Sequence, residues 1–237
     1  MLTISYSSIE RGGTRIIEAG ELCIPLGSTV GLVGLNGSGK STLMTAIAGA
    51  LTDRSATVAI RTPAGPVQSV GYVPQLPRLP DWLSAAETAR LFGVPPEDLV
   101  HHFPEFQLNL LLGTRIPALS GGQRQLLIVA LALRQRAELI MLDEPLSALD
   151  IRRRRQLLER LKERETGQQQ VVRLISSQIA ADIAEVCDWL IVLRDGRVVF
   201  QGARGSLVPS ATASLNTRTV EQASDHFEER ILKLLGE

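Results

Sequence analysis

Cysteine is scarce in this chain, which has two among 237 residues, and long apolar runs are absent. Cys23 and Cys187 stand among apolar neighbours without a CxxC spacing, which argues against a disulfide framework, redox chemistry or a cysteine-bound metal. The longest uncharged apolar run, 126–133, is far shorter than the roughly 20 residues that span a bilayer. The N-terminus lacks a charged-then-apolar signal pattern, so we expect a soluble chain in a reducing compartment.

An excess of basic charge is also lacking, because 25 Lys and Arg residues balance 25 Asp and Glu residues. Proteins that bind nucleic acid through its phosphates usually carry a basic surface, so we expect no nucleic-acid partner. Hydrophobic residues make up 44% of the chain. At this length, that content suits one large α/β domain or two small ones.

Alternating hydrophobicity near the N-terminus predicts an antiparallel sheet, which leads through an apolar strand into a helix. The expected elements are strands at 2–6, 21–26 and 29–34, a helix at 41–49, and a short strand pair at 56–60 and 70–74. Proline residues in 75–84 then mark a boundary.

A helical segment is expected after this boundary. Ser84 and Glu87 have the spacing of a capping box for a helix that ends near Phe92, and further helical turns are expected within 96–112. From Leu139 the chain returns to strands alternating with helices, as in a parallel sheet. These strands are predicted at 139–144, 171–176 and 189–193, and the helices at 148–165 and 179–186.

Charge and composition change in the last third of the chain. Four arginines, 152–155, precede Glu159 and Glu163 on the predicted helix, which favours a solvated, ion-paired face over contact with an acidic partner or lipid. Residues 202–218 are rich in small residues and are expected to form a linker. A capping box of Thr219 and Gln222 then opens an amphipathic helix, which we expect to pack on the chain's own core. Its apolar face contains Phe227, Ile231 and Leu234.

The segment GLNGSGKST, residues 34–42, satisfies the P-loop pattern between an apolar strand and a helix. Its backbone N–H groups are expected to cradle phosphates, while Lys40 reaches the β and γ oxygens and Ser41 binds Mg²⁺. The alternative is a glycine-rich turn without a ligand. The predicted nucleotide contacts are Asn36, Gly37, Ser38, Gly39, Lys40, Ser41 and Thr42.

An acidic pair follows the strand LIMLDE, whose residues are apolar until Asp143. Asp143 is expected to hold Mg²⁺, and Glu144 to orient and deprotonate an attacking water. A purely structural acid pair is the alternative, but buried carboxylates without a cation are costly.

A second anion site is predicted where LSGGQ meets an apolar run that indicates a buried helix. The first N–H groups of a helix lack intrahelical partners, and its dipole places partial positive charge there. The residues concerned are Ser120, Gly121, Gly122 and Gln123.

With these segments in this order, the chain resembles the ATP-binding cassette (ABC) ATPases, since LSGGQ between a P-loop and LDE is their signature. Gln75 in GYVPQ and the SALD loop, 147–150, match two further family motifs. The resemblance implies an α/β fold with a P-loop NTPase (RecA-like) core, an N-terminal antiparallel β part and an inserted helical subdomain. The implied divisions are 1–75 and 139–202 for the core, 76–138 for the helical subdomain, and 203–237 for the linker and C-terminal helix.

In this family two cassettes dimerise head to tail, which gives the second anion site a purpose. The resemblance implies that Ser120–Gln123 of one subunit close over the γ-phosphate of ATP held by the other subunit's P-loop. It also implies that Gln75 contacts Mg²⁺ at the catalytic site and that Asp150 contacts nucleotide.

Two positions depart from the family pattern. The family usually stacks an aromatic residue on adenine, where the stretch SSIERGGT offers Arg11, whose planar guanidinium can also stack on a base. The strand VVRLISSQ ends in Gln178, where the family normally has a histidine that contacts the γ-phosphate. Reduced hydrolysis is therefore expected.

The resemblance implies an ATP-hydrolysing subunit that powers a membrane transporter by closing as a dimer, either of identical or of related chains. Its implied cofactors are ATP and Mg²⁺. An integral membrane subunit is implied to bind the Gln75 loop and the helical subdomain, which places the chain on the cytoplasmic side of the membrane. The short insertion is more similar to small bacterial exporters than to importers. An ABC ATPase without a transport role, as in iron–sulfur cluster assembly, is the alternative.

Overall fold

The computed structural model describes residues 1–49, 56–163, 170–179, 183, 185–207, 227 and 229–236. Its strands are β1 (Leu2–Tyr6), β2 (Ile9–Arg11), β3 (Thr14–Ile17), β4 (Gly20–Ile24), β5 (Thr29–Val33), β6 (Val58–Thr62), β7 (Gly65–Pro66), β8 (Val70–Val73), β9 (Leu139–Leu142), β10 (Val172–Ser177), β11 (Trp189–Arg194) and β12 (Arg197–Ala203). Its helices are α1 (Lys40–Ile47), α2 (Ala85–Leu91), α3 (Pro96–His102), α4 (Gly121–Arg134) and α5 (Ile151–Lys162). Short 3₁₀ helices are η1 (Pro104–Phe106), η2 (Leu108–Leu110), η3 (Ile116–Ala118) and η4 (Arg204–Leu207).

A six-stranded sheet with the order β12-β11-β5-β10-β9-β8 forms the centre of the fold. Its strands are parallel except for β12, which pairs antiparallel with β11. Every residue of β5, β9 and β10 is buried, as expected for parallel strands covered on both faces. The carboxyl ends of β5, β9 and β10 lead into the P-loop, the acidic pair and Gln178. The parallel sheet thus brings the three motifs to one edge.

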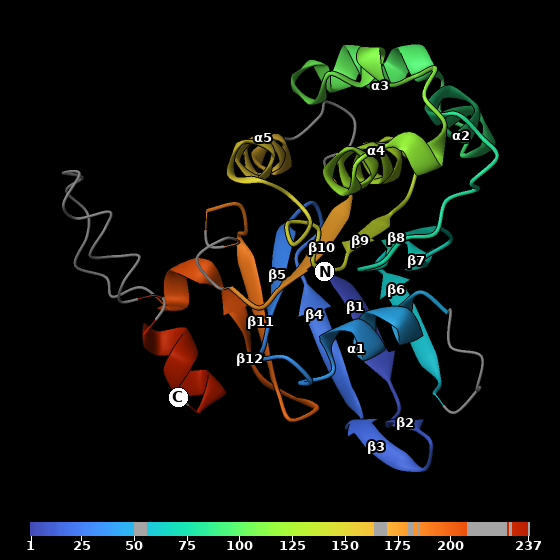
Figure 1. The fold of residues 1–237 in the computed structure, drawn as a ribbon. Coiled ribbons are helices and arrows are strands. Elements are labelled where there is room, and N and C mark those ends of the chain that lie inside the picture. The colour runs from blue at the N-terminus through green and yellow to red at the C-terminus, as the bar shows by residue number, and fades with distance from the viewer. Residues whose placement is uncertain are drawn as a thin grey trace.

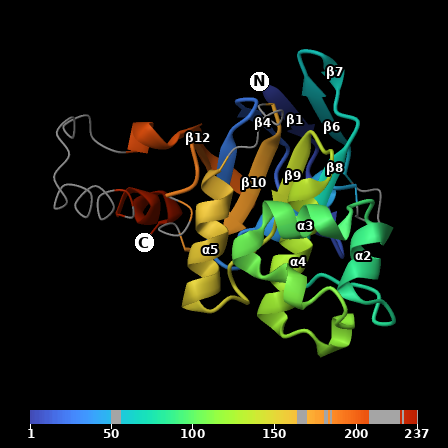
Figure 2. The ribbon, with the colours of Figure 1, turned by 90° about the horizontal axis from the view of Figure 1, so that it is seen from above.

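The two faces of this sheet belong to two hydrophobic cores. Along β9, Ile140 and Leu142 pack in one core while Leu139 and Met141 pack in the other, because successive strand residues point to opposite faces. The first core contains α4, α5 and the helical segment, which Figure 2 shows over β10 and β9. The second contains α1 and the sheet β4-β1-β6-β7, seen with α1 in the lower part of Figure 1.

Most predicted elements form where the residue patterns place them. β1 and β4 pair antiparallel, and the strands at 139–142, 172–177 and 189–194 lie in the parallel sheet. The capping box predicted for the helix after the proline-containing loop is present, because the Ser84 hydroxyl accepts from the Glu87 N–H and the Glu87 carboxylate from the Ser84 N–H. The α/β fold class is confirmed.

Three predictions of secondary structure were wrong. The strands near 56–60 and 70–74 do not pair, since β6 pairs with β1 and β7 while β8 pairs in parallel with β9. α5 begins at Ile151, three residues later than predicted, because the Asp150 carboxylate caps the helix by accepting from the Arg153 N–H at 2.9 Å. The predicted linker begins too early, because Gly202 and Ala203 pair with β11 and residues 204–207 form η4.

The C-terminal helix packs on the chain's own core, as predicted. Phe227, Ile231 and Leu235 are buried there, while Leu234 is only half-buried, so the buried face is shifted by one residue. The Leu234 carbonyl accepts from the Arg194 guanidinium at 3.0 Å. The Thr219–Gln222 capping box lies outside the described residues, as do residues 180–182 and 184 of the predicted helix 179–186.

Within the described ranges, the helices are all too short or too polar to cross a lipid bilayer.

Candidate functional site

A pocket of about 340 Å³ lies over the loop between β5 and α1. Its lining combines residues that are far apart in the sequence: Arg11, Ile16, Asn36, Gly37, Gly39, Lys40, Ser41, Thr42, Gln75 and Glu144. The structure therefore brings the predicted P-loop together with the predicted adenine-stacking, glutamine-loop and water-activating residues. Ile16, on β3 of the β2–β3 hairpin, was not anticipated from the sequence and adds an apolar surface to this pocket.

The P-loop backbone requires glycine at two close approaches. Gly39 has φ +102°, and a Cβ added there would lie 2.3 Å from the Ile17 Cδ1 atom. A Cβ at Gly34 would lie 2.4 Å from the Leu193 carbonyl oxygen. At position 34 only glycine fits without displacing the backbone of β11, because it has no Cβ. At position 39 the positive φ favours glycine, and a Cβ would also push the end of the Ile17 side chain aside.

Lys40 is buried and its ammonium is held by the loop that it follows. Its Nζ donates to the Gly34 carbonyl at 2.7 Å and to the Leu35 carbonyl at 3.2 Å, and lies 3.9 Å from the Glu144 carboxylate. Burial lowers the pKa of Lys40, against the attraction of Glu144 and Asp143. An anion entering the pocket would reverse this effect, because it favours the charged ammonium.

Glu144 combines burial with an unusual backbone. Its φ is +47°, which places its side chain in the pocket directly after the strand β9 ends. Burial raises the pKa of Glu144 and Asp143 adds to this effect, whereas Lys40 and a hydrogen bond from the Gln178 backbone oppose it. A carboxylate with a raised pKa is a better proton acceptor near neutral pH.

Ser176, near the end of β10, was missed by sequence reasoning and connects the two acidic residues. Its hydroxyl donates to the Asp143 carboxylate at 2.5 Å and accepts from the Glu144 N–H at 2.8 Å. Asp143 and Ser176 are both buried, at 1% and 0% exposure. The signal available in the sequence was a polar Ser-Ser pair at the end of a strand that is apolar except for Arg173.

The signature segment, Ser120–Gln123, lies away from the P-loop pocket, at the start of α4. The Ser120 hydroxyl accepts from the Gln123 N–H at 3.2 Å, and the Gln123 side chain accepts from the Ser120 N–H at 2.8 Å. Among the described residues, Ser120–Gln123 do not line the P-loop pocket of their own chain, and neither does Asp150. α4 and α1 pack on opposite faces of the central sheet.

Gln178 is exposed just after β10 and does not line the P-loop pocket, although its backbone reaches Glu144. Gln75 is also exposed, but it lines that pocket. The structure thus places Gln75 and Glu144 together, with Gln178 beside them.

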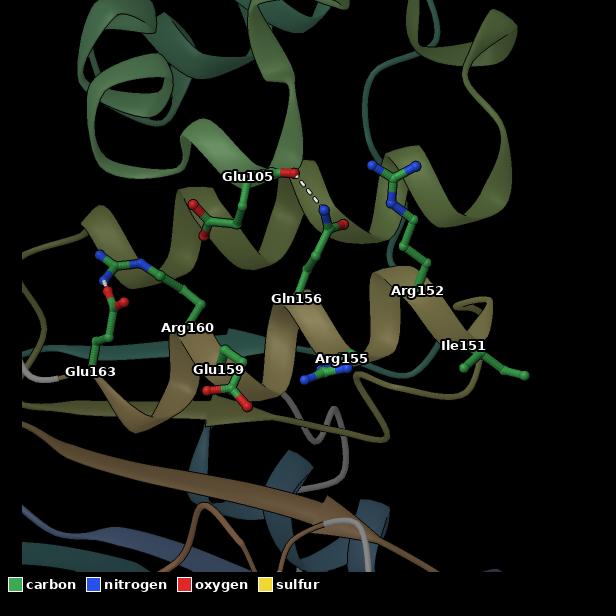
Figure 3. Close-up of a pocket in the computed structure, with 8 residues that line it drawn as sticks. All are labelled: Glu105, Ile151, Arg152, Arg155, Gln156, Glu159, Arg160 and Glu163. Atoms are coloured by element: carbon green, nitrogen blue, oxygen red, sulfur yellow. Dashed lines mark hydrogen bonds and ion pairs between the residues drawn. The ribbon is translucent and has the colours of Figure 1, made fainter.

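A groove of about 690 Å³ lies between α5 and η1 (Figure 3). Gln156 crosses it, because its side-chain amide donates to the Glu105 carbonyl at 2.9 Å. The two glutamates that follow the arginine run are ion-paired, as expected: Glu159 pairs with Lys162 at 3.1 Å, and Glu163 pairs with Arg160.

The family model described as ABC transporter matches residues 17–147 of the chain. An uncharacterised ABC transporter ATP-binding protein, YxlF of Bacillus subtilis, is 29% identical over 81% of the chain and 68% of its own length. The cobalamin import ATP-binding protein BtuD of Halobacterium salinarum is 28% identical over 89% of the chain, which spans only 57% of that relative. The Nod factor export ATP-binding protein I of Cupriavidus metallidurans is 28% identical over 92% of the chain and 75% of that protein.

Solved structures share the fold. The ATP-binding subunit of an ABC transporter superposes with a TM-score of 0.76 at 25% identity and covers 98% of both chains. The ATP-binding cassette MJ0796, solved as a dimer in a post-hydrolysis state with ADP and phosphate, superposes with a TM-score of 0.71 at 20% identity over 86% of this chain. The fold is therefore that of the P-loop NTPase domain of such subunits.

Proposed function

This chain belongs to the ABC transporter family, and from that premise we propose that it binds and hydrolyses Mg-ATP to drive a transporter in the membrane. The observation that carries the proposal is the convergence of the P-loop, Gln75 and Glu144 on one pocket. Relatives named for import and for export are both 28% identical to the chain, so the export direction expected from the short insertion stays a prediction.

The polar groups of the pocket suit a nucleoside triphosphate with a magnesium ion. The backbone N–H groups of Asn36, Gly37, Gly39 and Lys40, which line the pocket, are proposed to bind phosphate. Lys40 supplies the positive charge. Ser41 and Gln75, which line the pocket, and the buried Asp143 next to Glu144 offer the oxygen atoms that Mg²⁺ prefers. Bound Mg²⁺ would neutralise phosphate charge during phosphoryl transfer, while Glu144 holds the attacking water and accepts its proton.

We propose that Gln178 slows ATP hydrolysis without abolishing it. Its amide can replace the hydrogen bond of a neutral imidazole but cannot supply a positive charge. Losing one transition-state contact commonly lowers the rate by about 10²- to 10³-fold, and a retained hydrogen bond reduces that loss. We expect ATPase activity to fall more in Glu144→Gln than in Gln178→Ala, and to change in Gln178→His. A wild-type rate equal to that of Glu144→Gln would refute hydrolysis by the homodimer.

Dimer closure is proposed to place the signature segment of one subunit over the ATP of the other. Ser120–Gln123 sit at an open helix start, away from the P-loop pocket of their own chain, which supports a site formed in trans. Light scattering of Glu144→Gln should show an increase in mass with Mg-ATP, because ATP stays bound when its hydrolysis stops. The matched control is Glu144→Gln with Lys40→Ala, which should stay monomeric. Equal mass with and without ATP at high protein concentration would refute closure by the chain alone.

The membrane subunit is proposed to dock beside Gln75. Leu76 is 85% exposed and Trp82 is 74% exposed, which places two large apolar side chains on the surface next to the glutamine loop. Trp82→Ala should reduce recovery of the chain with a multi-span protein from detergent-solubilised membranes, without lowering its ATP affinity. Leu110→Ala, which removes another exposed apolar side chain on η2, is the control. Unchanged recovery and transport in Trp82→Ala would refute its part in docking.

A further inference from the structure

Arg153 in the first turn of α5 contacts both the signature segment and the SALD loop. Its Nη1 donates to the Ser120 hydroxyl oxygen at 3.4 Å, and its Nε lies 3.8 Å from the Asp150 carboxylate. A Cβ added at Gly122 would lie 2.8 Å from the same Nη1, so the guanidinium covers the Cα of that glycine. Glycine at position 122 therefore leaves room for Arg153.

The contact with Arg153 determines what the Ser120 hydroxyl can still do. A hydroxyl oxygen has two lone pairs and one hydrogen. The lone pairs accept from the Gln123 N–H at 3.2 Å and from Arg153 at 3.4 Å. The hydroxyl hydrogen remains as a donor toward an acceptor outside these contacts, such as a phosphate oxygen.

The positive charge of Arg153 is electrostatically unfavourable beside the start of α4 until an anion binds there. α4 has no acidic residue in its first turn, and the positive end of a helix dipole repels a neighbouring cation. Asp150 compensates only in part, because its side chain is 60% exposed and also caps α5. An incoming phosphate would meet the helix end and the guanidinium together.

We propose that Arg153 is a positioning residue for ATP-driven dimer closure, which fixes the Ser120 hydroxyl as a donor to the γ-phosphate bound by the partner subunit. This inference rests on the proposed function, because it needs the site formed in trans. Arg153 thereby connects the SALD loop to the signature segment within one subunit, whereas its effect falls on the nucleotide of the other.

The first test measures ATP-dependent dimerisation of Arg153→Met in the Glu144→Gln background. With about a threefold loss at each of two sites, we expect the dimer dissociation constant to rise about tenfold. Arg153→Lys keeps the charge, so its dimer dissociation constant should rise at most threefold. Arg155→Met, on the same helix but facing the groove, should match the parent. ATP affinity of the monomer should be equal in all four proteins.

The second test uses mixed subunits in the same background and measures capture of an untagged subunit by a tagged one with Mg-ATP. With Lys40→Ala and Arg153→Met in the same subunit, the only loaded P-loop faces the altered signature site, so capture should weaken about threefold. With the two changes in different subunits, the loaded P-loop faces an intact Arg153, so capture should equal that of Lys40→Ala with an unaltered partner.

The outcomes separate this inference from the proposed function. A Glu144→Gln parent that never dimerises would refute the proposed closure and this inference with it. A parent that dimerises and is weakened by Ser120→Ala, but not by Arg153→Met, would refute the role of Arg153 alone. If capture weakened only when Lys40→Ala and Arg153→Met were in different subunits, Arg153 would act on the nucleotide of its own subunit. That result would also overturn the proposal.

Discussion

Replacing Ser176 by alanine should destabilise the subunit more than any change of similar size at the end of β10. The serine hydroxyl is fully buried and links the Asp143 carboxylate to the Glu144 N–H. Losing a buried hydrogen bond to a charged group costs about 1.5–3 kcal/mol, and leaving a buried N–H without a partner costs about 1–3 kcal/mol. We therefore expect Ser176→Ala to lower the free energy of unfolding by about 3–5 kcal/mol.

The neighbouring Ser177→Ala is the matched control, because it removes the same atom from the same strand. Within the described part of the chain its hydroxyl bonds to neutral groups, donating to the Ile179 carbonyl at 3.1 Å and accepting from the Ile179 N–H at 3.0 Å. That local turn contributes about 1 kcal/mol. Each kcal/mol shifts Tm by about 2–4 °C at this size, so Ser176→Ala should melt about 10 °C below the wild type and Ser177→Ala about 3 °C below it.

Urea unfolding and thermal melting of both variants, without nucleotide, measure this difference. A double-mutant cycle of Ser176→Ala with Asp143→Asn should give a coupling energy of at least about 1 kcal/mol, because the hydrogen bond to the carboxylate is charge-assisted. If Ser176→Ala lost no more stability than Ser177→Ala, the bridge between the two acidic residues would not be the stabilising contact that the distances indicate.

Three other predictions test the site and the core. Gly39→Ala should lower ATP affinity at least about tenfold in a fluorescent-analogue titration, because its Cβ would collide with Ile17 at positive φ, a strain of about 1–3 kcal/mol; unchanged affinity would refute this. The raised pKa of Glu144 means that its protonated form favours folding, so the wild type should lose stability relative to Glu144→Gln as pH rises above the ordinary value of 4.5, and a pH-independent difference in urea unfolding would contradict this. Ile231→Ala should cost about 2–4 kcal/mol in urea unfolding, whereas exposed Leu232→Ala should cost almost nothing; equal losses would mean that the C-terminal helix is not packed as described.

Features that depend on neighbours in the sequence were predicted well. The capping box of Ser84 with Glu87 and the helix start at Ser120–Gln123 formed as expected, since each depends on residues within one helical turn. The order of the motifs was enough to identify the family, and the apolar strands before Gly34 and Asp143 indicated a parallel sheet buried on both faces. The domain divisions and the roles of the site residues stay predictions.

Features that depend on distant partners could not be predicted from residue patterns. β6 and β8 follow one another closely along the chain but belong to different sheets, because their hydrogen-bonding partners, β1 for β6 and β9 for β8, come from distant parts of the chain.

The sequence alone therefore determined the ATP-binding family, the parallel core and the starts of α2 and α4, because each of these depends on spacing along the chain. Only the tertiary structure decided that Ser176 joins the acidic pair and that Arg153 meets Ser120, since 33 residues separate each of the pairs Ser176–Asp143 and Arg153–Ser120. Hydrogen bonds of this kind leave no periodic signal, and they form only when the sheet and its covering helices place the partners within reach.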